Sequence, residues 1–382
     1  MLKKAILSGH RLMNKLDKAN DTAQRIIRAL SRFYKSDMRI RIRTAHISGV
    51  SYENIGDAGL LFLEDIAEKG KFSVYTTVNP MGADIYDNTF NLHEQFIKKQ
   101  EEIAKAYLKM GAIESFTCTP YDYFLVPKKG SHVAWAESSA VVYGNSFLEL
   151  YTNKESALSA LASAILGETI YSGMHIEENR KCTYSYKYKN KINELILGLI
   201  VYHIGKETER PFNIKLGKRL SSLEKKALSA ALGTIGNVAM LKIGDRKGIS
   251  KEVLKKDLEK EYLELNTSED GEIIILGCPH WNHKEIINLL EKMYGRCFKK
   301  DCIIACCKKA YESTIKIYDR KLLNKKRIYF FKGACPIFSP LLKEIGVSKV
   351  ITNSVKAAHY YKYRGIKVNL RELNSIIETE SE

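Results

Sequence analysis

The stretch Gly271–His283 reads GEIIILGCPHWNH, and its apolar run from Ile273 to Leu276 stops at Gly277, Cys278 and Pro279. A second stretch at 325–338, KKRIYFFKGACPIF, repeats the pattern and stops at a second Cys-Pro pair. Short apolar runs that are bounded by Gly and Pro indicate buried strands. The chain is therefore expected to end two separate strands in the same dipeptide.

Strand and helix patterns alternate around these two runs and continue to the end of the chain. Strands that are separated by helical patterns predict right-handed crossovers and a mostly parallel sheet. The expected strands are 272–277, 302–306, 327–332, 348–352 and 366–370, and the expected helices are 283–294, 308–323, one near 338–345, and 354–363.

The N-terminal half alternates in the same way, which predicts an α/β fold of several domains throughout. We expect a C-terminal parallel α/β domain at 265–375 and an N-terminal α/β region of one or two subdomains at 1–240, with the boundary between 215 and 265. The expected N-terminal elements are a basic helix to about residue 36, a half-buried strand within 38–50, a helix at 56–70, a strand at 71–78, a helix at 93–110 and a strand at 113–118.

Composition narrows the class of protein. The 382 residues predict two or three domains, and the hydrophobic fraction of 45% allows a sizeable core. Lys and Arg exceed Asp and Glu by 61 − 44 = 17, but the basic residues are dispersed and form no arginine-rich arm. This charge indicates a solvated surface first, help with an anionic substrate second, and nucleic acid last. No run approaches a membrane span or a signal peptide, so a cytoplasmic location is expected.

Three of the eight cysteines share one sequence context. Cys118, Cys278 and Cys335 each end an expected strand, with Pro one or two residues later. Because ligands gather beyond the carboxyl ends of parallel strands, these thiolates converge if the two halves of the chain face one another across a cleft. Three thiolates can hold an iron–sulfur cluster and leave one iron open as a Lewis acid. Zinc or a single iron would suit them too, and Cys302, Cys306 and Cys307 are assigned to the core.

Polar side chains also gather at loop tips and strand ends. Glu137, His46 and Lys356 are the strongest functional candidates, because they are titratable or charged groups in apolar or loop-tip settings. Among the remaining candidates, the Ser, Asn and Asp residues serve equally well as caps and turns. The remaining candidates are Ser48, Ser51, Asn54, Asp57, His132, Ser138, Ser139, Asn145, His175, Glu178, Asn179, Arg180, Asn353 and Ser354.

Seven stretches together resemble the aconitase X family, the diverged branch of the aconitase superfamily. They span residues 45 to about 361 in order, and they read AHISGVSYENIGDAG, TTVNPMGAD, FTCTPY, HVAWAESSAVVYGNS, GMHIEENR, LGCPH and NSVKAAHYY. The resemblance implies an aconitase-like α/β fold with an iron–sulfur cluster at a domain interface. It also implies a hydro-lyase reaction and a small swivelling partner domain.

The resemblance assigns roles residue by residue. Cys118, Cys278 and Cys335 would hold a [4Fe–4S] cluster, with a [2Fe–2S] cluster or a single iron as alternatives. Glu137 or His46 would handle the proton of the departing hydroxyl, and Lys356 and Arg180 would carry the charge of the reacting carboxylate. The expected substrate-binding residues are Asn54, Asp57, Asn79, Ser138, Ser139, His175 and Arg180.

The chain departs from the family pattern at three places. Gly333 and Ala334 replace the usual Asp-Thr before Cys335, and Lys154 replaces an arginine after Thr152 and Asn153. The C-terminal IIETESE lacks a cysteine that is often found there, and it is expected to be a frayed end.

Two reactions of the family compete as the function. One is dehydration of mevalonate 5-phosphate to anhydromevalonate phosphate by a two-subunit enzyme, and the other is dehydration of cis-3-hydroxy-L-proline, in which the small domain is often fused. The chain leaves no room for that domain after its last element, which favours the two-subunit form with a small swivel-domain partner. A metal- or RNA-binding protein without enzyme activity is the alternative from another class.

Overall fold

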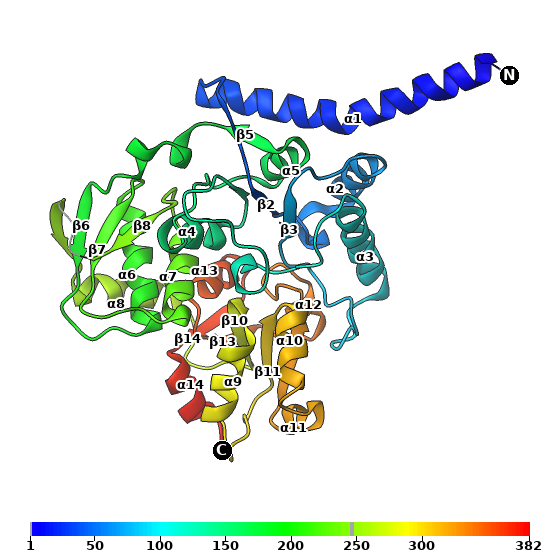
Figure 1. Ribbon diagram of the computed structural model, residues 1–382. Coiled ribbons are helices and arrows are strands. Elements are labelled where there is room, and N and C mark those ends of the chain that lie inside the picture. Colours follow the sequence, from blue (N-terminus) through cyan, green and yellow to red (C-terminus); the bar gives the residue numbers. More distant parts are fainter. Residues whose placement is uncertain (1, 245–247) are drawn as a thin grey trace.

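The computed structural model describes residues 2–244 and 248–382, with side chains from Lys18 onward. It confirms the expected α/β class, because the sheets of three, four and five strands are all parallel and all carry helices (Figure 1). Within the described part of the chain, no helix is both long enough and apolar enough to cross a membrane. We refer below to the N-terminal region (2–180), the middle region (181–270) and the C-terminal region (271–382).

The N-terminal region is built on a three-stranded sheet. Strand β2 (Thr44–Ile47) is fully buried between β3 (Tyr75–Val78) and β4 (Ala134–Trp135). The helices α2 (Tyr52–Ala67), α3 (Glu94–Lys109), α4 (Ser138–Phe147) and α5 (Ala157–Leu166) complete this region. The long α1 (Leu2–Tyr34) lies on the outside, where Ala23 and Ile27 pack with residues of α5 (Figure 1).

Two N-terminal predictions are wrong in detail. The expected strand within 38–50 is split, because β1 (Arg39–Arg41) pairs antiparallel with β5 (Glu168–Ile170) while β2 enters the parallel sheet. Residues 113–118 form no strand. The Val78 N–H donates to the side chain of Ser115 at 2.7 Å instead of a backbone carbonyl, and Phe116 has a φ of +32°. A backbone in the left-handed region cannot continue a strand.

The middle region holds a four-stranded parallel sheet of order β8-β7-β6-β9. Its strands are β6 (Tyr184–Lys187), β7 (Phe212–Lys215), β8 (Leu241–Ile243) and β9 (Ile249–Glu252). Helices α6 (Glu194–Glu207), α7 (Ser222–Thr234) and α8 (Lys255–Leu265) complete the region, and α6 and α7 contribute many residues to the main core. The domain boundary expected between 215 and 265 falls inside this region.

The C-terminal region confirms the expected alternation. Its five parallel strands have the order β12-β11-β10-β13-β14, and core clusters cover the two faces of the sheet. The strands are β10 (Ile273–Trp281), β11 (Cys302–Cys306), β12 (Ile328–Lys332), β13 (Lys349–Thr352) and β14 (Lys367–Leu370). The helices are α9 (His283–Lys292), α10 (Lys308–Ile315), α11 (Arg320–Lys325), α12 (Leu341–Glu344), α13 (Val355–Tyr363) and α14 (Leu373–Glu380).

Three C-terminal predictions need correction. The first strand does not end at its Cys-Pro pair, because β10 continues through Cys278 and Pro279 to Trp281 with a register shift after Leu276. The expected helix 308–323 is broken, because Asp319 starts a new helix by accepting a hydrogen bond from the Lys321 N–H. The expected frayed end is ordered. Ile376 is fully buried in α14, and Glu382 exchanges two backbone hydrogen bonds with Cys297.

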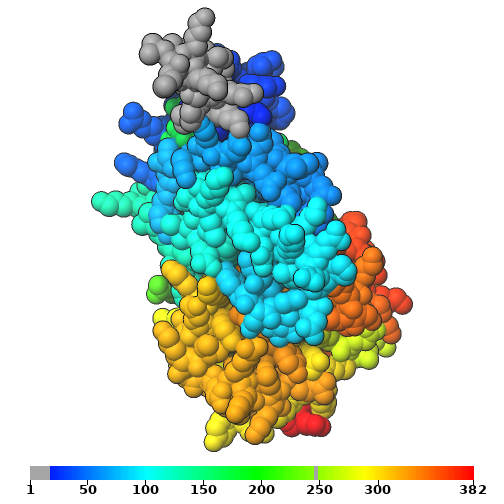
Figure 2. Space-filling model, turned by 90° about the vertical axis from the view of Figure 1, so that its right-hand side faces the viewer, coloured from blue at the N-terminus to red at the C-terminus, as the bar shows by residue number. Residues whose placement is uncertain are grey.

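The N-terminal and C-terminal regions meet at the segment that carries Cys335. The Met81 N–H donates to the Gly333 carbonyl at 2.8 Å, and the Cys335 N–H donates to the Met81 carbonyl at 2.9 Å. The buried ammonium of Lys332 lies 3.4 Å from the buried carboxylate of Asp84. Blue and cyan N-terminal residues therefore continue directly into orange C-terminal residues on one face of the molecule (Figure 2). This interface fixes the positions of the side chains described next.

Candidate active site

Cys118, Cys278 and Cys335 line a single cavity of about 190 Å³, which we call the cysteine cavity. Cys118 lies in the loop after residues 113–117, Cys278 lies within β10, and Cys335 follows β12. Glu137, His280 and Lys356 share the lining with the three cysteines. The other lining residues come from the segments 48–54, 79–80 and 336–338 and from Gly277.

The sulfur atoms face hydrogen-bond donors as well as one another. The His280 N–H points at the Cys118 Sγ at 3.2 Å. The backbone N–H groups of Ile337 and Phe338 face the Cys335 thiol, and the Ser354 side chain faces Cys278. Burial raises the pKa of all three thiols, to about 12 for Cys278, and the nearby Lys356 opposes this in each case. Burial therefore favours the protonated thiols, and Lys356 and the hydrogen-bond donors offset only part of the cost of negative charge on sulfur.

The main charged pair of the cavity joins α4 to α13. The Lys356 Nζ lies 2.5 Å from the Glu137 Oε1, and both side chains are buried. Asn79 Nδ2 donates to Oε2 at 2.8 Å, and Ser139 Oγ donates to Oε1 at 2.8 Å. Burial would raise the pKa of Glu137, but Lys356 and the amide and hydroxyl donors lower it to about 2. Glu137 is therefore ionised at neutral pH, and the same contact raises the pKa of Lys356.

His46 extends this network into β2. Its Nε2 lies 2.9 Å from Asn79 Oδ1, and its Nδ1 lies 2.8 Å from Thr77 Oγ1. Because the Asn79 amide nitrogen donates to Glu137, its oxygen accepts from His46, which assigns the proton to Nε2. Burial lowers the pKa of His46 to about 4, against the opposing effects of Glu137 and Asn79. His46 is thus a neutral ring that orients Asn79.

Six of the expected site residues lie away from the cavity lining, and two of them, His46 and Ser139, still belong to the hydrogen-bond network of Glu137. Asp57 is exposed on α2, where it pairs with Lys99 and accepts from the Tyr52 hydroxyl at 3.0 Å. Ser138 begins α4 with its backbone against Gly233, so it adjoins Glu137 without lining the cavity. His175 bonds to His132, with 2.9 Å between their Nδ1 atoms.

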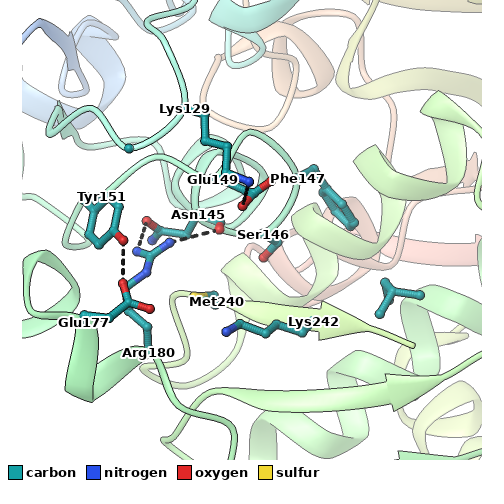
Figure 3. A pocket seen from close by; sticks show the side chains of 12 residues that line it. Lys129, Asn145, Ser146, Phe147, Glu149, Tyr151, Glu177, Arg180, Met240 and Lys242 are labelled. Atoms are coloured by element: carbon teal, nitrogen blue, oxygen red, sulfur yellow. Dashed lines mark hydrogen bonds and ion pairs between the residues drawn. The ribbon is translucent and has the colours of Figure 1, made fainter. Parts of the chain in front are cut away.

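Arg180 lines a different pocket, of about 390 Å³, which we call the Arg180 pocket (Figure 3). Its guanidinium donates to Asn145 Oδ1 at 3.1 Å and to the Asn145 carbonyl at 3.2 Å. It also lies 4.0 Å above the ring of Tyr151. Lys129, Glu149, Glu177 and Lys242 also line this pocket, and α4 separates it from Glu137.

Sequence reasoning missed His280 and underrated Lys154. His280 is 2% exposed, and it is one of the residues that line the cysteine cavity. Its position two residues after Cys278 was the available signal. Burial, together with the charge of Lys356, lowers the pKa of Lys154 to about 8, against the opposing effect of Glu137, so this lysine belongs to the same electrostatic environment.

The cysteine cavity does not present a site for a single metal ion. Across residues 2–244 and 248–382, no three Cys, His, Asp or Glu side chains lie close enough to bind one ion together. A cluster of several iron atoms joins ligands that are farther apart, and it favours thiolates whose sulfur atoms accept N–H bonds. The three thiolates and the N–H donors at their sulfur atoms are compatible with such a cluster.

Comparison with known proteins gives a consistent result. Models of the aconitase X first domain and third domain match residues 7–178 and 271–382. The phosphomevalonate dehydratase large subunit of Thermococcus kodakarensis is 32% identical over 373 residues, which cover 93% of this chain and 94% of that protein. The crystal structure of the holo-form of Thermococcus kodakaraensis aconitase X superposes with a TM-score of 0.87 at 32% identity and covers 95% of both chains.

A second kind of relative is more distant. The cis-3-hydroxy-L-proline dehydratase of Hypocrea jecorina is 29% identical over 375 residues, which cover 90% of this chain but 62% of that protein.

Proposed function

Because the chain belongs to the aconitase X family, we propose that it is the large subunit of a hydro-lyase that dehydrates (R)-mevalonate 5-phosphate. The product would be trans-anhydromevalonate 5-phosphate, an intermediate on a mevalonate route to isoprenoids. The observation that carries the proposal is the convergence of three cysteines and a buried Glu137–Lys356 pair on one cavity. The greater similarity to the phosphomevalonate dehydratase subunit favours this substrate over cis-3-hydroxy-L-proline.

We assign the cofactor site to Cys118, Cys278 and Cys335. Three thiolates suit a [4Fe–4S] cluster with one iron free of protein ligands, and a [2Fe–2S] cluster is the alternative. When bound, such a cluster supplies a Lewis acid that weakens the bond to the leaving hydroxyl. The N–H donors around the sulfur atoms support the assignment.

The remaining side chains bind the substrate and handle its proton. Lys356 provides the positive charge that stabilises the carboxylate as the adjacent proton is removed. The Lys356–Glu137 pair holds one proton on Lys356 in the resting site, within reach of the departing hydroxyl. Asn79 and Ser139 fix the orientation of Glu137, and His46 fixes that of Asn79. Asn54 lines the cavity from the start of α2 and is exposed, which suits a residue that meets the entering substrate.

The base that removes the proton is assigned to the small swivel-domain partner. The relative's printed name, a large subunit, supports such a two-chain enzyme. This chain by itself should therefore be inactive, and full dehydration by the isolated chain would contradict the two-subunit proposal.

The test is co-expression with the small subunit and an assay against both candidate substrates. We expect a brown complex that absorbs near ~400 nm and dehydrates mevalonate 5-phosphate. Cys118→Ser should remove colour and activity together, whereas the matched control Cys297→Ser, which lies outside the cavity, should keep both. A colourless wild-type protein that instead retards RNA would support the non-enzyme alternative.

A further inference from the structure

We propose that His280 contacts the substrate in the cysteine cavity, where its Nδ1 accepts a hydrogen bond from the hydroxyl group that the reaction removes. The inference rests on the proposed dehydratase function, and it adds a residue that the sequence analysis did not assign to the site. Three observations carry it: the tautomer of the ring, its unused acceptor, and the way the backbone around it is held.

The hydrogen bonds of the ring assign its tautomer. The His280 Nε2 lies 3.0 Å from the carbonyl oxygen of Ala334. A carbonyl only accepts hydrogen bonds, so Nε2 carries the proton and Nδ1 carries a lone pair. This Nδ1 is buried and has no hydrogen-bond partner among the described residues. Such an unused buried acceptor is costly, which indicates that a ligand completes it.

The backbone of His280 is held from two sides. Its N–H faces the Cys118 Sγ, and its carbonyl accepts from the Lys226 Nζ at 2.9 Å. Lys226 is fully buried and lies 2.7 Å from both Asp122 and Glu285. Because Lys226 also bridges the loop after Cys118 to the start of α9, the backbone that carries the ring is fixed, and the hydrogen bond from Nε2 to Ala334 orients the ring. Its lone pair therefore stands in a prearranged position.

The chemistry of the ligand selects the hydroxyl group. A phosphorylated hydroxy acid carries a carboxylate, a phosphate and a hydroxyl. The carboxylate, and the phosphate once ionised, only accept hydrogen bonds, so a lone pair repels them. The hydroxyl can donate its hydrogen to Nδ1, and the lone pairs of its oxygen remain free for other contacts in the cavity. His280 would thus recognise the one group that distinguishes the substrate from its dehydrated product.

Two substitutions separate this contact from a structural role. In His280→Gln the amide nitrogen replaces Nε2 and keeps the bond to Ala334, but no acceptor remains at the Nδ1 position. In His280→Asn the amide oxygen replaces Nδ1, and the bond to Ala334 is lost. The assembled two-subunit protein would be tested for iron content and for equilibrium binding of mevalonate 5-phosphate and of its 3-deoxy analogue.

We expect His280→Gln to keep its iron and to bind mevalonate 5-phosphate about tenfold more weakly, with unchanged affinity for the deoxy analogue. His280→Asn should keep the preference for the hydroxylated ligand, even where its iron content falls. Equal binding of the two ligands by the wild-type protein would overturn the inference without any variant. The wild-type complex could dehydrate the substrate while His280→Gln keeps the full preference for mevalonate 5-phosphate over the deoxy analogue. That result would overturn the His280 contact alone. Absence of both binding and dehydration overturns the dehydratase proposal and this contact with it.

Discussion

The cysteine cavity and the Arg180 pocket are two polar sites at opposite ends of the same helix, α4, and they differ in how they are built. The first is enclosed between the N-terminal and C-terminal regions, and its central pair, Glu137 and Lys356, is buried. The second opens between the N-terminal and middle regions, where Lys129 and Glu149 pair at the surface. Arg180 is buried there, but its hydrogen bonds go to Asn145 and Met174.

The difference between the two sites shows which of the motif residues come together at the cysteine cavity. Cys278, Cys335 and Lys356 lie in, after or just beyond strands of one parallel sheet, whose topology brings them to one edge. His175 and Arg180 lie in short 3-10 turns, Gly173–His175 and Glu177–Arg180, that no sheet register positions. Tertiary contacts position these two residues instead. The family motifs alone therefore did not show that His175 and Arg180 lie apart from the cysteine cavity.

The largest expected effect lies at Lys356. Lys356→Met should lower the dehydration rate by about 10²–10³-fold, because it removes the cation at the reacting carboxylate. It should also lower the unfolding free energy by about 3–5 kcal/mol, because Glu137 is left buried and unpaired. Lys242→Met, the matched change in the Arg180 pocket, should leave the rate within about threefold of wild type. Similar losses of rate in both variants would break the distinction between the sites.

Arg180 tests the same comparison from the other side. Arg180→Met removes hydrogen bonds to Asn145 and Met174 and the contact with Tyr151. We expect the unfolding free energy to fall by about 2–3 kcal/mol in urea titrations, with little change in KM at 25 °C. A large rise in KM with unchanged stability would show instead that Arg180 binds the substrate.

The cysteine cavity has two buried neutral histidines in its surroundings, His46 and His280, and His175 lies near Arg180; all three rings should destabilise the protein in acid. Burial lowers the pKa of His46 and of His280 to about 4 and that of His175 to about 3. Below the ordinary histidine pKa of about 6.5, the unfolded chain binds protons at these rings and the folded chain does not. The free energy of unfolding therefore falls as the pH drops toward 4. Each ring should contribute about 1.4 kcal/mol per pH unit in that window.

Urea unfolding between pH 6.5 and 4.5 measures this slope. His175→Gln should reduce the slope by the contribution of one histidine ring. An identical slope in wild type and His175→Gln would mean that His175 titrates normally in the folded protein.

The sequence predicted the C-terminal sheet better than the N-terminal half for a physical reason. Four of its five strands contain runs of buried apolar residues, so one pattern predicted all four as strands, although β10 continues to Trp281, beyond its expected end at residue 277. Residues 113–118 carry a similar pattern, but the Ser115 side chain occupies the ladder position of a backbone group. The convergence of the cysteines was predicted from three strand ends, but only Cys335 follows a strand, because Cys278 lies within β10 and Cys118 follows a segment that forms no strand. The sequence could not predict the unused Nδ1 of His280, because an acceptor without a hydrogen-bond partner is recognised only when the atoms around it are known.

The smallest expected effect concerns Lys154, the departure from the family's arginine. Its Nζ donates to the Gly236 carbonyl at 3.1 Å, and burial lowers its pKa to about 8. Above that pH the side chain loses its charge, so affinity for an anionic substrate should fall in the wild type as the pH rises from 7 to 9. Lys154→Arg stays charged and should keep a flat KM, which gives about a two- to fivefold difference at pH 9 and little at pH 7. Parallel pH profiles would place Lys154 outside the reach of the substrate and would confine the cationic part of the cysteine cavity to Lys356.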